Sequence, residues 1–146
     1  MLKLKPYHAD LLLKIYEMRR EEKLRRARVW LLGSFRAENM DQFNQACPTG
    51  SDENAYYRQV ITYWDMVAAI VNRGMLDQDL FFESTLEAML VWQRVKAVVQ
   101  EFREMRKNPL YVRNLEIMAE KQAEWLETRA PGALEATLKA VKAPAK

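Results

Sequence analysis

Few side chains in this chain of 146 residues have the types and spacing that catalysis or metal binding requires. His8 is the only histidine, so neither the Glu-x-x-His pairs of di-iron bundles nor the His-Glu-x-x-His motif of zinc hydrolases can be assembled. We interpret His8 as a surface or helix-start residue near a loose N-terminus. The sequence therefore predicts no histidine-ligated metal, no bound cofactor and no catalytic residue.

The cysteine and the glycines also form no catalytic or phosphate-binding motif. Cys47 precedes Pro48 in a predicted loop, and the chain has no second histidine to activate its thiolate, so we interpret it as an inert thiol. A single cysteine cannot form an internal disulfide, which agrees with a reducing compartment and leads us to expect a cytoplasmic protein. The four glycines stand apart in the sequence and cannot form a glycine-rich phosphate-binding loop.

Carboxylates are the remaining chemical candidates. Glu83, Glu87, Glu101 and Glu104 repeat with the polar face of a predicted helix, as carboxylates on a solvated helix do. Asp65, between Trp64 and Met66, is the one acid whose burial a structure should test. We expect Asp65 to be a surface residue, and an enzyme that uses it beside a hydrophobic pocket is the weakest of three functional hypotheses.

A cluster of basic side chains is the clearest candidate for a binding surface. Part of its charge is locally compensated, because Glu21 and Arg25, and Glu22 and Arg26, have the spacing of ion pairs within a helix. The cluster is a candidate for an anionic surface or a protein interface. Its members are Arg19, Arg20, Lys23, Arg25, Arg26 and Arg28.

Charge is distributed in blocks along the chain. Residues 1–36 contain 10 Lys and Arg against 4 Asp and Glu, residues 37–93 contain 2 against 9, and residues 94–146 contain 11 against 7. The overall formal charge of +3 therefore hides strong polarity. We expect basic and acidic helices to neutralise each other within the fold or across a homo-oligomer.

The elements that must position these residues are helices. Helix formers dominate, Gly and Pro number only 4 and 5, and no alternating runs typical of strands occur. We predict an all-α fold, a bundle of five to six helices built around a long central hairpin. It forms one domain over residues 1–146, with residues 1–6 and 142–146 frayed. The uncharged runs are too short to cross a bilayer, and we find no signal peptide.

The predicted hairpin joins apolar-faced helices at residues 56–71 and 80–105. Gly74 takes a left-handed conformation that ends the first helix, and Asp77 caps the next. Trp64 and Trp92 lie on the apolar faces, so we expect both to be buried.

Four further helices are predicted around the hairpin. One long helix covers residues 7–32, and short helices cover residues 35–46 and 133–141. Another follows the restart at Asn108 and Pro109, with Asn108 as its cap and Pro109 at its first position, and runs to residue 128.

An ordered set of segments carries a family resemblance. It comprises Tyr63-Trp64-Asp65-Met66-Val67, Asn72-Arg73-Gly74-Met75-Leu76-Asp77, Trp92, Arg103, Asn108-Pro109-Leu110-Tyr111 and Leu115-Glu116. From about Ala27 to Trp125 the chain resembles a bacterial helical family catalogued as domain of unknown function 4760. Asp65 stands where such proteins often carry Glu, and we do not find the N-terminal membrane span of several similar proteins, which argues against a membrane location. The resemblance implies a fold and transfers no catalytic residue.

Besides an enzyme that uses Asp65, two hypotheses follow for function. We favour a non-enzymatic bundle that acts through protein contacts, as a homo-oligomer or with a protein partner. The alternative is a peripheral module that binds membrane lipid or nucleic acid through its basic first helix, without a transmembrane segment. Nucleic acid is disfavoured, because the helix after Gly74 carries Asp77, Asp79, Glu83 and Glu87 and no cation before Arg94.

Overall fold

The computed structural model describes residues 3–142, and in that range the chain forms eight α-helices and no strand. The helices are α1 (Pro6–Arg19), α2 (Glu22–Ser34), α3 (Met40–Ala46), α4 (Asp52–Asn72), α5 (Gln78–Ser84), α6 (Glu87–Arg106), α7 (Arg113–Arg129) and α8 (Ala133–Val141). The all-α class is confirmed, whereas the predicted number of five to six helices is wrong. Within the described part of the chain, no helix is long and apolar enough to cross a membrane.

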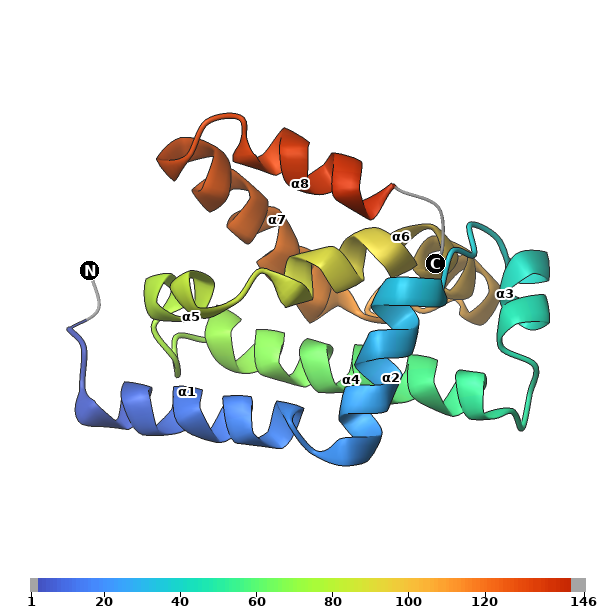
Figure 1. The fold of residues 1–146 in the computed structure, drawn as a ribbon, viewed down its shortest axis with the longest axis horizontal. Coiled ribbons are helices and arrows are strands. Elements are labelled where there is room, and N and C mark those ends of the chain that lie inside the picture. Colours follow the sequence, from blue (N-terminus) through green and yellow to red (C-terminus); the bar gives the residue numbers. More distant parts are fainter. Residues whose placement is uncertain (1–2, 143–146) are drawn as a thin grey trace.

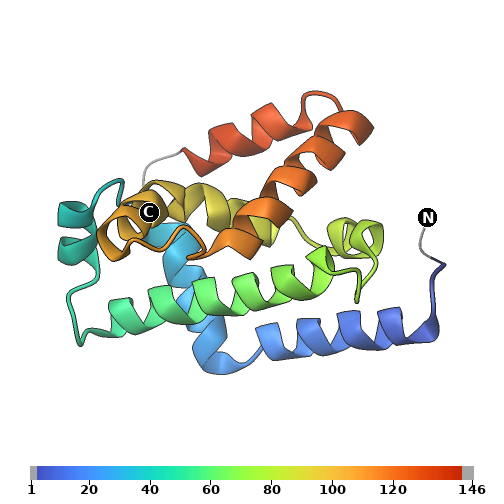
Figure 2. The ribbon, with the colours of Figure 1, turned by 180° about the vertical axis from the view of Figure 1, so that it is seen from behind.

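The long first helix predicted over residues 7–32 is divided into α1 and α2. Its break lies at Arg20 and Glu21, where the Glu21 carboxylate accepts hydrogen bonds from the backbone N–H groups of Lys23 (3.1 Å) and Leu24 (3.0 Å). Glu21 thus caps a new helix and does not continue the old one. Figures 1 and 2 show the result: α1 runs beside α4, whereas α2 turns across it.

The predicted central hairpin is not formed. Its second arm breaks at Thr85, which is extended (φ −165°), so that α5 and α6 replace one helix. The closest backbone neighbours of α4 are α7 and α2, and α6 lies farther from α4 than either. The reason lies in α5, which follows the Gly74 turn directly and buries Phe81 and Phe82.

The core nevertheless contains the residues expected from helical periodicity. Trp64 has no exposed surface and Trp92 is 5% exposed, which confirms their predicted burial. Aromatic rings continue this core towards α3 and α6, where Phe43 packs edge-on against Tyr57 and Phe102 at centroid distances of 4.8 and 5.1 Å. Such contacts stabilise the native state beyond the burial of apolar surface alone.

Residues near the N-terminus are also better anchored than predicted. His8 is 1% exposed, so its placement on the surface is wrong, although it does lie in the first turn of α1. Its Nδ1 accepts a hydrogen bond from the Asp77 N–H at 3.0 Å. Of the predicted frayed ends, Pro6 and Lys142 belong to helix ends, and residues 1–2 and 143–146 lie outside the described range.

The start of α7 differs from its prediction. Asn108 and Pro109 lie in a turn before the helix, and the Asn108 side chain accepts a hydrogen bond from the Leu110 N–H at 3.0 Å. Helix α7 begins four residues later and receives no cap from its own Ncap residue. Asp65 of α4 takes this role, because its Oδ1 accepts a hydrogen bond from the Leu115 N–H at 2.8 Å. Asp65 is half-buried and holds a helix end.

Two helices end with the same hydrogen-bond pattern but with different residues. At the end of α4, Gly74 has φ 76°, as predicted, and Met75 N–H donates to the Ile70 carbonyl at 3.1 Å. At the end of α6, Lys107 has φ 51°, and Asn108 N–H donates to the Arg103 carbonyl at 3.0 Å. Both are Schellman motifs, in which glycine is preferred at the left-handed position.

The two left-handed helix ends predict opposite effects of substitution on stability. Replacing Lys107 with Gly should raise the free energy of unfolding by about 0.5–1 kcal/mol, because a side chain is strained in the left-handed region. Replacing Gly74 with Val should lower it by about 1 kcal/mol or more, since a β-branched residue resists this conformation. Urea unfolding of both variants measures the difference. Equal midpoints for the Gly74 variant and the wild type would contradict the assignment.

Candidate functional site

The six residues of the basic cluster do not form one surface. Arg19 ends α1, Arg20 lies in the turn, and the remaining four lie on α2. Arg20, Lys23, Arg25 and Arg26 are exposed, whereas Arg19 and Arg28 are half-buried and point towards other helices. The structure therefore separates two arginines that contact the interior from four cations that face solvent.

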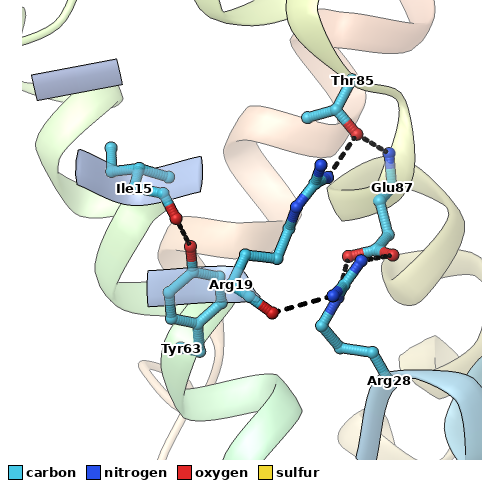
Figure 3. A network of polar contacts seen from close by, with 6 residues as sticks. All are labelled: Ile15, Arg19, Arg28, Tyr63, Thr85 and Glu87. Carbon is cyan, nitrogen blue, oxygen red and sulfur yellow. Dashed lines mark hydrogen bonds and ion pairs between the residues drawn. The ribbon is translucent and has the colours of Figure 1, made fainter. Parts of the chain in front are cut away.

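Arg28 and Glu87 form the centre of a partly buried polar network (Figure 3). Arg28 Nε and Nη2 each donate to one Glu87 carboxylate oxygen at 2.7 Å, and the two side chains are 16% and 13% exposed. A third donor, Arg28 Nη1, reaches the Arg19 carbonyl at 2.9 Å. The guanidinium thus joins α2 to α6 and to the end of α1, and it satisfies a carbonyl that helix geometry leaves without a partner.

Thr85, the residue at the break between α5 and α6, extends this network. Its hydroxyl oxygen accepts hydrogen bonds from Arg19 Nη1 (3.3 Å) and from the Glu87 N–H (3.0 Å). The Thr85 carbonyl accepts a further hydrogen bond from Nε2 of buried Gln122 at 2.8 Å. One residue therefore connects α1, α6 and α7.

A tyrosine holds the middle of α1. The Tyr63 hydroxyl donates to the Ile15 carbonyl at 2.6 Å, and this contact is buried (Figure 3). Burial raises the pKa of Tyr63 to about 12, so the phenol keeps its proton at neutral pH and remains a donor. Helix α1 is attached through this bond, through Arg19 and through His8, which are spread along its length.

A small apolar pocket, called here the pocket under α1, lies between α1 and residues of α4 and α5. Its volume is about 200 Å³, which exceeds the roughly 150 Å³ of an engineered apolar cavity that holds benzene. Trp64 lines the pocket, and its indole N–H has no hydrogen-bond partner among the described residues. The lining residues are Leu12, Leu13, Ile15, Tyr16, Arg19, Trp64, Phe81, Ser84 and Thr85.

Two large apolar side chains of α1 stand exposed at this pocket. Leu13 is 65% exposed and Tyr16 is 47% exposed. The guanidinium carbons of Arg19 and Arg20 lie 5.1 and 5.6 Å from the centroid of the Tyr16 ring, a distance at which a cation is attracted to the ring. The pocket therefore has an apolar rim on α1 and cations at the end of that helix.

The cysteine, the histidine and Asp65, which the sequence offered as reactive side chains, lie outside this pocket and have structural surroundings. Cys47 is buried, and burial, with a smaller contribution from Glu53, raises the pKa of its thiol to about 12. Asp65 is used as a helix cap, and His8 Nδ1 accepts a backbone hydrogen bond. Among residues 3–142, no group of three or more His, Cys, Asp or Glu side chains could hold a metal ion.

The sequence did not reveal the residues that organise this site. Glu87 has the spacing of a solvated carboxylate, and Tyr63 is one of many aromatic residues at helical spacing. Only Thr85 left a signal, because Ser84 and Thr85 are poor helix formers in the middle of a predicted helix. The weakness of that signal explains why the break was missed.

These features define an all-α protein with a small apolar pocket under a peripheral helix and a polar network at its end. The chain matches the family model described as "Domain of unknown function (DUF4760)" over residues 8–125 and therefore belongs to this family. The match agrees with the resemblance and extends further towards the N-terminus. Neither a curated protein nor a solved structure gave a significant match.

The network makes a prediction about stability. Replacing Glu87 with Gln should lower the free energy of unfolding by about 3 kcal/mol, because Arg28 would keep its charge in a nearly dry site without a counter-ion. The double variant Arg28→Met/Glu87→Leu should lose less than the single variant, since no charge is then buried. Urea unfolding measures the free energy of unfolding of the wild type, the single variant and the double variant.

The exposed pair of Glu22 and Arg26 is the matched control. Its atoms are 2.6 Å apart, but the side chains are 76% and 67% exposed. Replacing Glu22 with Gln should change the free energy of unfolding by about 0.5 kcal/mol or less. A similar loss at the two pairs would show that burial does not determine the strength of the Arg28 contact.

Cys47 gives a second prediction. Alkylation by iodoacetamide at pH 8 should be roughly thousandfold slower in the folded protein than in urea, because a pKa of about 12 leaves very little thiolate. Mass spectrometry at timed intervals measures the rates. Equal rates in the two states would mean that the thiol is accessible and ionised in the folded chain.

Proposed function

We propose that this protein is a non-enzymatic helical module that acts by binding another protein, most simply a second copy of itself. The observation that carries the proposal is the apolar pocket under α1 with exposed Leu13 and Tyr16 at its rim. Interfaces obtain most of their binding energy from a few large side chains that enter such pockets. The rim supplies side chains of this kind, and the pocket supplies their receptor.

Charge supports a second copy as the partner. Arg20 follows α1 on one side of the pocket, and exposed Glu83 precedes the pocket residue Ser84 on the other. In a two-fold contact each patch meets its own copy, so Arg20 of one molecule can pair with Glu83 of the other, and the reverse. The acidic middle and the basic first part of the chain are then complementary between molecules.

Light scattering coupled to size exclusion tests this proposal over a wide range of protein concentrations. The wild type should elute as a dimer, and Leu13→Glu or Tyr16→Glu should shift it to monomer without changing its melting temperature. Leu110→Glu is the matched control, because Leu110 is 74% exposed on the turn between α6 and α7. A wild type that remains monomeric at high concentration would contradict self-association.

Charge exchange adds a sharper arm to the same experiment. Arg20→Glu and Glu83→Arg should each weaken the dimer, and the chain that carries both changes should recover it, because every pair is then reversed and restored. A dimer that neither change weakens would show that Arg20 and Glu83 lie outside the interface.

The second candidate is a peripheral module that binds an anionic surface. The observation in its favour is that Arg20, Lys23 and Arg25 are exposed at the corner between α1 and α2 and form no ion pair among the described residues. Sedimentation with acidic vesicles, and titration with duplex DNA, should then show binding that weakens steeply as salt rises. Such binding by a monomer would replace our first proposal with this one.

A further inference from the structure

A second depression, larger than the pocket under α1, lies beside the first half of α4. It has a volume of about 760 Å³, within the range of about 300–1,000 Å³ typical of small-molecule sites. Residues of α3, α4, the end of α6 and the turn before α7 surround it. Four aromatic residues contribute to its lining: the buried Phe43, Tyr57 and Phe102 and the half-buried Tyr111.

The charged side chains that line this groove are all positive. They are Arg58 and Arg106, and no Asp or Glu lines the groove, although the segment from 37 to 93 is strongly acidic. Neither arginine forms an ion pair among residues 3–142. Arg58 donates through Nε to Asn54 Oδ1 at 3.0 Å, which leaves the other nitrogens of its guanidinium available.

Arg106 is oriented by aromatic rings. Its guanidinium carbon lies 4.7 Å from the Phe102 centroid and 5.5 Å from the Tyr111 centroid. An arginine held in this way loses little side-chain entropy when it binds an anion, because its plane is already fixed. Carboxylates and phosphates match the fork of N–H donors that such an arginine presents.

Two tyrosines add a neutral donor. The hydroxyl oxygens of Tyr57 and Tyr111 lie 3.2 Å apart, so one hydroxyl donates to the other, and the accepting hydroxyl keeps its own proton for a further acceptor. Burial raises the pKa of Tyr57 well above its usual range and also raises that of Tyr111. Both groups therefore stay protonated at neutral pH.

The turn that carries Tyr111 is strained. Val112, a buried β-branched residue, has φ 56°, a strained conformation that persists only where its surroundings impose it. The preceding carbonyl, that of Tyr111, accepts a hydrogen bond from Arg103 Nε at 2.8 Å. Strain of this kind is concentrated at binding sites, where it fixes a side chain in position.

We propose that this groove binds a small organic anion that carries a flat ring. The ring lies against the aromatic part of the groove, and the anionic group pairs with Arg106 and Arg58. The shared chemistry is an aromatic carboxylate or an aromatic phosphate. This site is separate from the pocket under α1, and the proposal does not rest on the interface proposed there.

Isothermal titration calorimetry of the full chain tests the proposal with four probes: naphthoate, naphthyl phosphate, naphthamide and inorganic phosphate. The two aromatic anions should bind at least about tenfold more tightly than the neutral amide or inorganic phosphate, because only they satisfy both the rings and the arginines. The stronger of the two identifies the anionic group. Equal affinity for naphthamide, or no binding of either aromatic anion, would overturn the proposal.

Variants locate the site. Arg106→Gln and Arg58→Gln should each weaken binding of the aromatic anion by about tenfold, and Tyr111→Phe should weaken it less. Arg129→Gln is the matched control, because Arg129 also lies over a ring, 5.0 Å from the Trp125 centroid, but outside the groove. All four side chains are exposed or half-buried, so the variants should fold, and thermal melting verifies this. Unchanged binding by both arginine variants would refute the assignment.

Discussion

The ion pair between Arg28 and Glu87 is the contact on which the arrangement of the N-terminal half depends. It joins α2 to α6 across a nearly dry interface, and the same guanidinium reaches the end of α1 through the Arg19 carbonyl. Because Glu87 is the first residue of α6, its position also depends on the break at Thr85. The pocket under α1 lies beside these joined helix ends, where the middle of α1 is held by the Tyr63 hydroxyl and by the burial of Ile15.

Helical periodicity predicted the fold class and the core, and local chemistry did not predict the breaks. Burial of Trp64 and Trp92 and the positive φ of Gly74 follow from apolar spacing and from the preference of glycine for a left-handed helix end. Glu21 and Lys107, by contrast, are good helix formers that end or begin helices here. Packing between distant segments selects these ends, so the sequence pattern predicted continuous helices and a hairpin that does not form.

The candidate site was predictable in composition but not in geometry. The sequence shows six cations near one another, and it cannot show that Arg28 turns inward while Arg26, two residues earlier, pairs with Glu22 in solvent. Glu21 illustrates the same difficulty, because its spacing favours a pair with Arg25, yet its carboxylate caps α2. The groove beside Tyr57 and Tyr111 left no signal, since its residues come from α3, α4, α6 and a turn.

The cap that Asp65 gives to α7 has a consequence for the order in which the molecule assembles. The residue before α7, Val112, offers no side-chain oxygen, so the first turn of that helix is completed by a carboxylate fifty positions earlier in the chain. An isolated segment with the sequence of α7 lacks this acceptor, and it also lacks the packing of its apolar face, which supplies most of the stability of a helix in a protein. We therefore expect formation of α7 to be coupled to the docking of α4, so that the two helices gain or lose protection against amide exchange as one cooperative unit.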